Sequence, residues 1–125
     1  MMIGIGTDFV SKKRIEALWL KYELHFAKKI LNAFEIELLS KNRDPIGFLS
    51  KRFAAKEAVS KALGTGIGEY VKFHDITIQN KPSGQPYVEF RGVALETANK
   101  LGVKNIHISL TDEKNYALAF VILNA

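Results

Sequence analysis

The chain has 125 residues, of which 47% are hydrophobic, and this size suits one domain with one core but is too short for two ordinary domains. It contains no cysteine and no apolar run near the ~20 residues of a membrane-spanning helix, so disulfides and thiol catalysis are excluded and no membrane-spanning segment is expected. The formal net charge of +5 favours an anionic partner, which could be a nucleic acid, an acidic protein, a phosphorylated ligand or a membrane surface. We predict a single domain over residues 1–125.

The first half of the chain is predicted to form one strand and then helices. Residues Met2–Asp8 alternate apolar side chains with glycine, as a strand does where another backbone or a ligand comes close. Ser11 is suited to cap the helical turns whose apolar periodicity lasts to Leu39. Asp44-Pro45 starts a further helix, since proline suits the first helical position after an aspartate cap. Gly64 can end this helix after about 18 residues.

The second half changes to the two-residue period of strands. Ile76 and Ile78 alternate with polar residues, and Tyr87–Phe90 alternates again after a turn-rich segment, which predicts a hairpin with a long loop. A short helix over Val93–Leu101 leads to a second hairpin, whose strands cover residues 106–110 and 116–123. Helices in one half and antiparallel pairs in the other predict an α+β fold, with helices packed on antiparallel β-hairpins.

Three charged side chains are candidates for chemistry on a phosphate. Asp8 ends the predicted first strand, while Glu57 and Lys61 are four residues apart and so share one face of a helix. A carboxylate can hold a hard cation, and an ammonium group can contact a phosphate. The same spacing also fits a turn residue beside an ordinary exposed Glu–Lys pair. These residue types therefore allow, without requiring, a magnesium site that handles a pyrophosphate.

The order and spacing of several short motifs are more specific than any one of them. The motifs are Gly4-Ile5-Gly6-Thr7-Asp8 with Arg14-Ile15, Arg52-Phe53-Ala54-Ala55-Lys56-Glu57-Ala58 with Lys61-Ala62, Gly64-Thr65-Gly66-Ile67-Gly68, His74-Asp75-Ile76, Gly84-Gln85-Pro86-Tyr87, and Ser109-Leu110-Thr111 with Tyr116-Ala117. With this set the chain closely resembles the holo-acyl-carrier-protein synthases over nearly its whole length. The resemblance implies a 4'-phosphopantetheinyl transferase-like fold and a cytoplasmic homotrimer with each active site between two subunits.

The activity that the resemblance implies is transfer of 4'-phosphopantetheine from coenzyme A to a serine of an acyl carrier protein, which supports fatty acid biosynthesis and releases adenosine 3',5'-diphosphate. Asp8, Glu57 and Lys61 would be the catalytic residues, and the two carboxylates would bind Mg²⁺. The residues implied in coenzyme A binding are Arg52, Lys61, Gly64, Gly66, Pro86 and Thr111. No side chain stands out as the general base, since a water on the metal or Glu57 acting through a water could take the serine proton.

A basic face is predicted on the first helices. Lys12, Lys13 and Arg14 lie in the first helical turn, where positive charge opposes the helix dipole, so the residues alone predict either a compensating partner or a solvated basic face. The resemblance implies that the acidic carrier protein docks here. The residues implied in that docking are Arg14, Lys21, His25 and Lys28, with His25 standing where the family pattern predicts an arginine.

One position departs from the family pattern, because Asp112 follows Thr111 where relatives often carry a histidine. A carboxylate there would repel nucleotide phosphates unless Lys114 or another cation paired with it, or the turn pointed it away.

Two other functions stay open on the residues alone. A non-catalytic basic module would bind nucleic acid or an acidic protein without a metal ion, and a magnesium-dependent hydrolase would cleave coenzyme A without a carrier protein. The aromatic residues fall mostly at core spacing, so a base-stacking platform is disfavoured and no nucleic acid partner is expected. His74 and His107 have no metal-ligand spacing and are expected to be structural or exposed.

Overall fold

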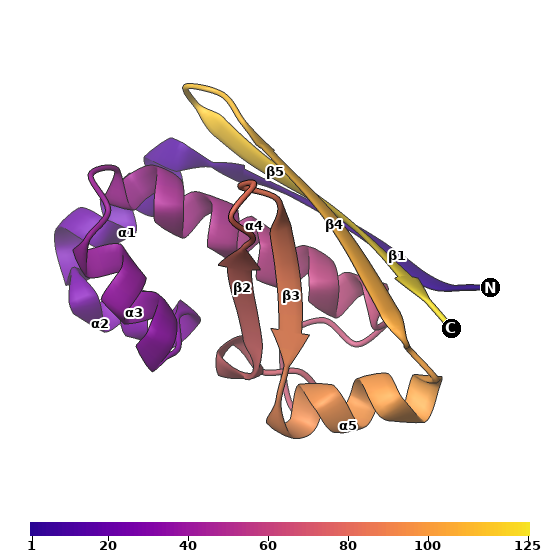
Figure 1. The fold of residues 1–125 in the computed structure, drawn as a ribbon. Coiled ribbons are helices and arrows are strands. Elements are labelled where there is room, and N and C mark those ends of the chain that lie inside the picture. Colours follow the sequence, from indigo (N-terminus) through magenta and orange to yellow (C-terminus); the bar gives the residue numbers. More distant parts are fainter.

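A long helix packed across one face of an antiparallel sheet forms the centre of the molecule (Figure 1). The structure is a computed structural model that describes residues 1–125. Its elements are, in chain order, β1 (Met2–Ser11), α1 (Lys12–Tyr22), α2 (Leu24–Ile30), α3 (Ala33–Ser40), α4 (Pro45–Ala62), the 3-10 helix η1 (Phe73–Asp75), β2 (Ile76–Asn80), β3 (Pro86–Phe90), α5 (Gly92–Leu101), β4 (Asn105–Asp112) and β5 (Tyr116–Asn124). No helix has both the length and the apolar character that crossing a membrane requires.

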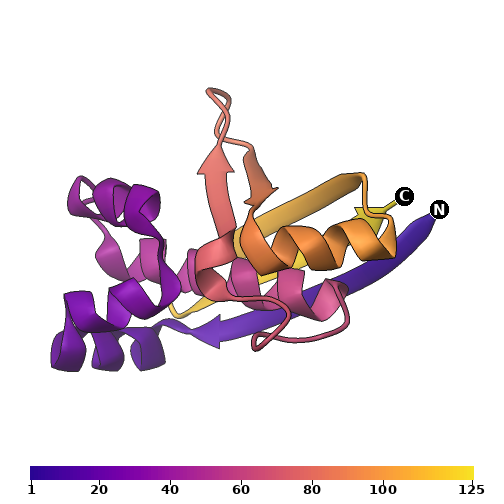
Figure 2. The ribbon, with the colours of Figure 1, turned by 90° about the horizontal axis from the view of Figure 1, so that it is seen from below.

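The strands form two antiparallel sheets, which confirms the predicted α+β class. The larger sheet has the order β1-β5-β4, and the smaller one is the β2–β3 hairpin. Both predicted hairpins are present. In Figure 2 helices α1 to α3 gather on one side of the β2–β3 hairpin and α5 lies on the other. The pairing of β1 with β5 was not predicted, because the two strands lie at opposite ends of the chain and no turn motif connects them.

The predicted boundaries of α4 are confirmed to within one residue. The Asp44 side chain caps the helix by accepting a hydrogen bond from the Gly47 backbone N–H at 3.0 Å, and Pro45 takes the first helical position. At the other end Leu63 is the C-cap, and Gly64 follows it with a φ of +85°. The helix thus ends one position earlier than predicted, and Gly64 directly follows the C-cap in the left-handed conformation that glycine adopts readily.

The core is one cluster of 24 buried hydrophobic residues, many of them from α4 and from one face of the larger sheet. The residues that β5 contributes are Ala117, Ala119, Val121 and Leu123. The opposite face of this sheet carries large apolar side chains that remain exposed. They are Ile5 (53% exposed), Phe9 (62%), Tyr116 (46%) and Leu118 (36%). A sheet with one packed face would normally be polar on the other, so this face is unusual.

Two glycines let β1 lie directly on α4. A Cβ atom added to Gly4 would come 1.9 Å from the carbonyl oxygen of Ala62, and one added to Gly6 would come 2.0 Å from that of Ala58. Both obstacles are backbone atoms that cannot move alone. The glycines predicted to allow a close approach therefore admit another backbone, and residues 4, 6 and 8 share the strand face that meets α4.

A buried ion pair joins the helices to the β2–β3 hairpin. Glu35 of α3 and Lys56 of α4 are both fully buried, with Lys56 Nζ 2.6 Å from Glu35 Oε1. The same ammonium group donates to the carbonyl oxygens of Ile30 (2.7 Å) and Phe73 (3.0 Å), so its three protons are all satisfied. The Ile78 backbone N–H donates to the other carboxylate oxygen of Glu35 at 3.0 Å. Burial lowers the pKa of Lys56, and Glu35 opposes this shift.

Replacing Gly6 by alanine is expected to destabilise the fold by about 3 kcal/mol, because β1 and α4 must separate to admit the methyl group. Chemical denaturation monitored by circular dichroism measures this. Gly68→Ala is the matched control, since no atom lies within 4 Å of a Cβ at Gly68, and it should change stability by less than about 0.5 kcal/mol. Equal stabilities of the two variants would contradict the close packing.

Candidate active site

Asp8 and Lys61 meet where β1 crosses α4. Lys61 Nζ lies 3.1 Å from Asp8 Oδ1 and donates to the Thr7 carbonyl oxygen at 3.0 Å. Asp8 follows Gly4 and Gly6 on the strand face that packs on the helix, so the glycine contact sets its distance from Lys61. Strand β1 continues to Ser11, so Asp8 lies within the strand and not at its end as predicted. The structure therefore places this carboxylate against α4.

Glu57 lies one helical turn before Lys61 and is half-buried. Burial raises the pKa of the Glu57 carboxyl group, and the nearby charge of Asp8 raises it further, whereas Lys61 and Arg14 lower it. The two acids are therefore close enough to repel each other, and the two cations offset part of that repulsion. Asp8, Glu57 and Lys61, which were predicted as a group, are brought together by one strand and one helix.

The donor chemistry of this site fits a hard divalent cation. Asp8 and Glu57 offer only carboxylate oxygens, and their mutual repulsion would be relieved by a cation between them. No group of three or more His, Cys, Asp or Glu side chains is arranged to hold a metal ion anywhere in the chain. A cation here would thus have two side-chain ligands, which is the number Mg²⁺ commonly takes when substrate phosphates and waters supply the rest.

The loop after α4 begins beside Lys61 and depends on glycine. Gly64 and Gly66 have φ values of +85° and +69°, and nothing lies within 4 Å of a Cβ at either position. The Gly66 backbone N–H donates to the Ser60 carbonyl oxygen at 3.1 Å, which closes the end of the helix. The loop therefore leaves the helix next to the carboxylate site with open space around its backbone.

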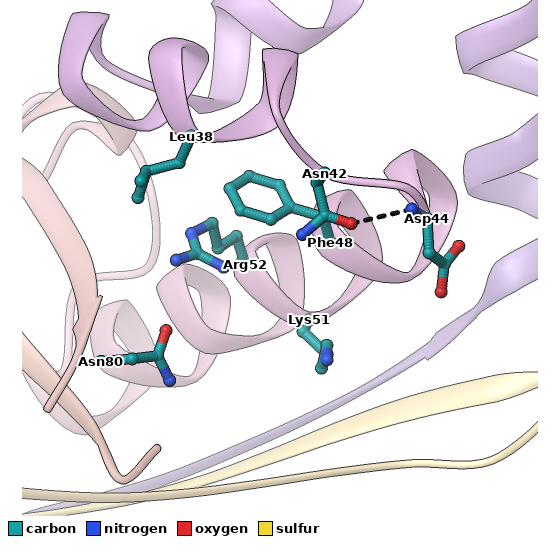
Figure 3. Close-up of a pocket in the computed structure, with 7 residues that line it drawn as sticks. All are labelled: Leu38, Asn42, Asp44, Phe48, Lys51, Arg52 and Asn80. Atoms are coloured by element: carbon teal, nitrogen blue, oxygen red, sulfur yellow. Dashed lines mark hydrogen bonds between the residues drawn. The ribbon is translucent and has the colours of Figure 1, made fainter. Parts of the chain in front are cut away.

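A separate polar cleft of about 320 Å³ lies on another side of α4, between α3 and the β2–β3 hairpin (Figure 3). Its lining residues are Leu38, Asn42, Asp44, Phe48, Lys51, Arg52 and Asn80. Arg52 is buried, with its guanidinium group 3.8 Å from the centre of the Phe48 ring and with Nη2 donating to the Ile78 carbonyl oxygen at 3.1 Å. A smaller adjoining cleft shares Lys51 and Arg52 and adds Pro86.

The predicted coenzyme A residues consequently occupy two places within one chain. Lys61 contacts Asp8, and Gly64 and Gly66 lie in the loop that follows α4, whereas Arg52 and Pro86 line the clefts. Arg52 precedes Glu57 by five residues, which places it about 140° around the helix and hence on a different face. The cleft residue Lys51 was missed by the sequence reasoning, although its position directly before Arg52 was a usable signal.

Thr111, the last of the residues predicted to bind coenzyme A, lies on the larger sheet. It is exposed near the end of β4, where it pairs with Leu118 of β5. Its neighbour Asp112 has a partner, because Lys12 Nζ donates to Asp112 Oδ2 at 2.9 Å. This hydrogen bond, assisted by the charge of Lys51, lowers the pKa of Asp112. Lys12 is thereby the cation that pairs with Asp112.

The residues predicted to dock an acidic protein are all exposed on two consecutive helices. Arg14 and Lys21 lie on α1, and His25 and Lys28 lie on α2. The Arg14 guanidinium carbon lies 5.8 Å from the centre of the Phe53 ring, and its charge offsets part of the rise in the Glu57 pKa. This basic face therefore begins at the edge of the carboxylate site.

Comparisons with known proteins assign this arrangement to a family. Residues 4–121 match the 4'-phosphopantetheinyl transferase superfamily. The holo-[acyl-carrier-protein] synthase of Vibrio cholerae is 46% identical over 123 residues, which are 98% of each chain. The crystal structure of the enzyme of that name from Neisseria meningitidis has a TM-score of 0.95 at 38% identity and covers all of both chains. The Helicobacter pylori enzyme, solved in complex with coenzyme A, has a TM-score of 0.84 at 31% identity, with 96% of this chain and 99% of that chain covered.

The chain belongs to the 4'-phosphopantetheinyl transferase superfamily, among the holo-acyl-carrier-protein synthases, and is an enzyme of that transferase class. The fold and the family that the motifs predicted are both confirmed.

Asp8→Asn is expected to lower the pKa of Glu57, because it removes the charge that raises it and leaves Lys61 free to act on Glu57 alone. Carbon-detected NMR titration of the glutamate carboxyl groups, without divalent cations, measures this shift. Asp112→Asn is the control and should leave the Glu57 pKa unchanged, since Asp112 is paired with Lys12. A Glu57 pKa that stays constant or rises in Asp8→Asn would show that the two acids do not interact.

Proposed function

We propose that this chain transfers 4'-phosphopantetheine from coenzyme A to a serine of an acyl carrier protein, in the cytoplasm and in support of fatty acid biosynthesis. The observation that carries the proposal is the meeting of Asp8, Glu57 and Lys61 at one strand–helix contact in a chain of this family. In the reaction the serine oxygen bonds to the phosphorus that bears pantetheine. The bond from that phosphorus to the nucleotide phosphate oxygen breaks, and adenosine 3',5'-diphosphate leaves.

Each of the three side chains has a role that its surroundings support. Asp8 and Glu57 would hold Mg²⁺, which when bound neutralises charge on the pyrophosphate oxygens. Lys61 lies beside Asp8 and can donate to a phosphate oxygen, which stabilises the negative charge that grows on the leaving phosphate. Glu57 lies close enough to Asp8 and Lys61 for their charges to act on it, and a carboxylate in this position can serve as a general base. We assign it the serine proton, taken through a water molecule.

Coenzyme A is proposed to lie between two subunits of a homotrimer. Within one chain Arg52 and Pro86 line clefts on a different side of α4 from the carboxylates. One coenzyme A molecule could contact both sets of residues if the cleft of one subunit faced the carboxylates of the next. Lys51 and Arg52 would bind the anionic nucleotide end there. The exposed apolar face of the β1-β5-β4 sheet supports assembly, because burying it removes a large apolar surface from water. We also propose that Gly64, Gly66 and Thr111 contact coenzyme A.

The acidic carrier protein is proposed to dock on α1 and α2. Arg14, Lys21, His25 and Lys28 are exposed there, and the face starts beside Glu57, where the serine must arrive. Rim charges of this kind mainly steer association.

The test mixes the protein with coenzyme A, Mg²⁺ and an apo carrier protein and weighs the carrier by mass spectrometry. A gain of one phosphopantetheine mass is expected. Asp8→Ala and Glu57→Gln should each reduce the transfer rate at least about 100-fold, since each removes a charge on which transition-state stabilisation depends. Chelation of divalent cations should do the same. Glu96→Gln, an exposed acid on α5, is the control with unchanged activity.

Three outcomes would contradict the proposal. A carrier of unchanged mass together with adenosine 3',5'-diphosphate release would make the chain a hydrolase of coenzyme A. An unchanged carrier together with salt-sensitive binding of oligonucleotides would make it a nucleic-acid-binding module. Near-native transfer by Asp8→Ala at saturating Mg²⁺ would remove the assigned metal ligand.

Leu118→Glu is expected to convert the trimer to a monomer and to abolish transfer, because it places a charge in the apolar sheet face. Light scattering at micromolar concentration measures the molar mass. Leu95→Glu is the matched control, since Leu95 on α5 has a similar exposed fraction, 41% against 36%, but lies outside the sheet. A wild-type protein that is monomeric and fully active would overturn the shared-site arrangement.

A further inference from the structure

A groove of about 430 Å³ opens where α2 and α3 meet η1 and the end of β3. Its floor includes the apolar side chains of Leu31 and Ile36. Its rim carries three basic residues, which are Lys28 of α2, His74 of η1 and Arg91 at the start of α5. No acidic side chain lines it. The groove is distinct from the cleft that contains Arg52 and from the carboxylate site, since it shares no lining residue with either.

Hydrogen bonds hold the two walls of this groove in place. The His74 imidazole contacts the Lys28 carbonyl oxygen, and Arg91 Nε donates to the His74 carbonyl oxygen at 3.1 Å. Asn32 Nδ2 donates to Thr77 Oγ1 at 2.7 Å, which ties the start of α3 to β2. Neither the Lys28 ammonium group nor the Arg91 guanidinium group forms a salt bridge within the chain. The rim therefore presents two cations that have no acidic partner within the chain, and the Arg91 side chain is held by the His74 backbone.

We infer that this groove is a second docking surface for the carrier protein, and that it takes a helical segment in which an apolar side chain lies between acidic ones. The inference rests on the proposed function and extends the docking surface beyond α1 and α2 to His74 and Arg91. An apolar floor between basic walls is complementary to such a segment, because the apolar side chain is buried while the acids reach the rim.

The position of the groove supports this occupant. Lys28 belongs both to the basic face of α1 and α2 and to the rim, so the two surfaces are continuous. The Phe73 ring, next to His74, packs 5.8 Å from the Phe53 ring on which Arg14 lies. A partner bound at Arg14 thus has a connected path of contacts to the groove. A small free anion is a poor occupant, since the basic groups on the rim are exposed and no buried donor points into the groove.

The inference is tested by charge reversal on both walls. Lys28→Glu and Arg91→Glu should each raise the Michaelis constant for carrier protein about fivefold, with the constant for coenzyme A unchanged, since rim charges act on association of the charged partner. Calorimetric titration with apo carrier protein, without coenzyme A, should show the same loss of affinity. Lys100→Glu is the control: it makes the same charge change about 14 Å further along α5. Melting temperatures verify that the variants fold, and Arg91→Gln provides a milder change if Arg91→Glu does not.

Carrier affinities in the Arg91 variants that equal that of Lys100→Glu would overturn the inference, because Lys28 also belongs to the basic face of α1 and α2 whereas Arg91 belongs to the groove alone. The inference would also be overturned if a single-stranded oligonucleotide bound at the groove and left the affinity for the carrier protein unchanged. Failure of the proposed function gives a different result, because the wild-type protein would then modify no carrier at all.

Discussion

The buried ion pair between Glu35 and Lys56 is the constraint on which the arrangement of the other elements depends. Removing one partner of such a pair costs ~3–5 kcal/mol, because the other charge stays buried without compensation. The groups that hold the Lys56 ammonium come from the end of α2, from α3 and from η1, so α4 has one rotational setting against all three. With Lys56 turned toward them, Glu57 lies about 100° further around the helix. That rotation directs Glu57 toward β1 and Asp8.

The Glu35 carboxylate also fixes the position of Arg52 on another side of α4. Arg52 Nε lies 3.7 Å from Glu35 Oε2, and the guanidinium group bonds to the backbone of Ile78, whose own N–H donates to Glu35. Burial lowers the pKa of Arg52 and Glu35 opposes this shift, yet arginine remains charged in proteins. One rigid helix thus presents an acidic half-site on one face and a basic cleft on another, and Glu35 fixes both. This geometry is the physical reason why an assembly of several copies suits the proposed reaction.

Local patterns predicted the helices and both hairpins, because each depends on residues close in sequence, whereas the grouping of Asp8 with Glu57, 49 residues further along the chain, came from the family resemblance. Asp8 was accessible to prediction because the alternating glycines indicated a close approach, and Glu57 with Lys61 because their spacing is helical. The role of Glu35 was not predicted, although Asn32 and Glu35 have the spacing of a capping box, which the structure contains. Its pairing with Lys56, 21 residues away, follows no local rule. The unpredicted pairing of β1 with β5 has the same cause.

The carboxylate site opposes folding, and the energetic compensation lies elsewhere in the chain. The pKa of Glu57 is higher in the folded state than in the unfolded chain. The free energy of unfolding therefore falls as the pH rises through the folded-state pKa and this carboxyl group ionises. The strand and helix that carry Asp8 and Glu57 nevertheless stay in contact, since Gly4 and Gly6 allow backbone packing that no side chain separates. The repulsion is therefore retained within a rigid frame. A site of this kind is preorganised for positive charge, and the Lys61 ammonium group already supplies one such charge beside Asp8.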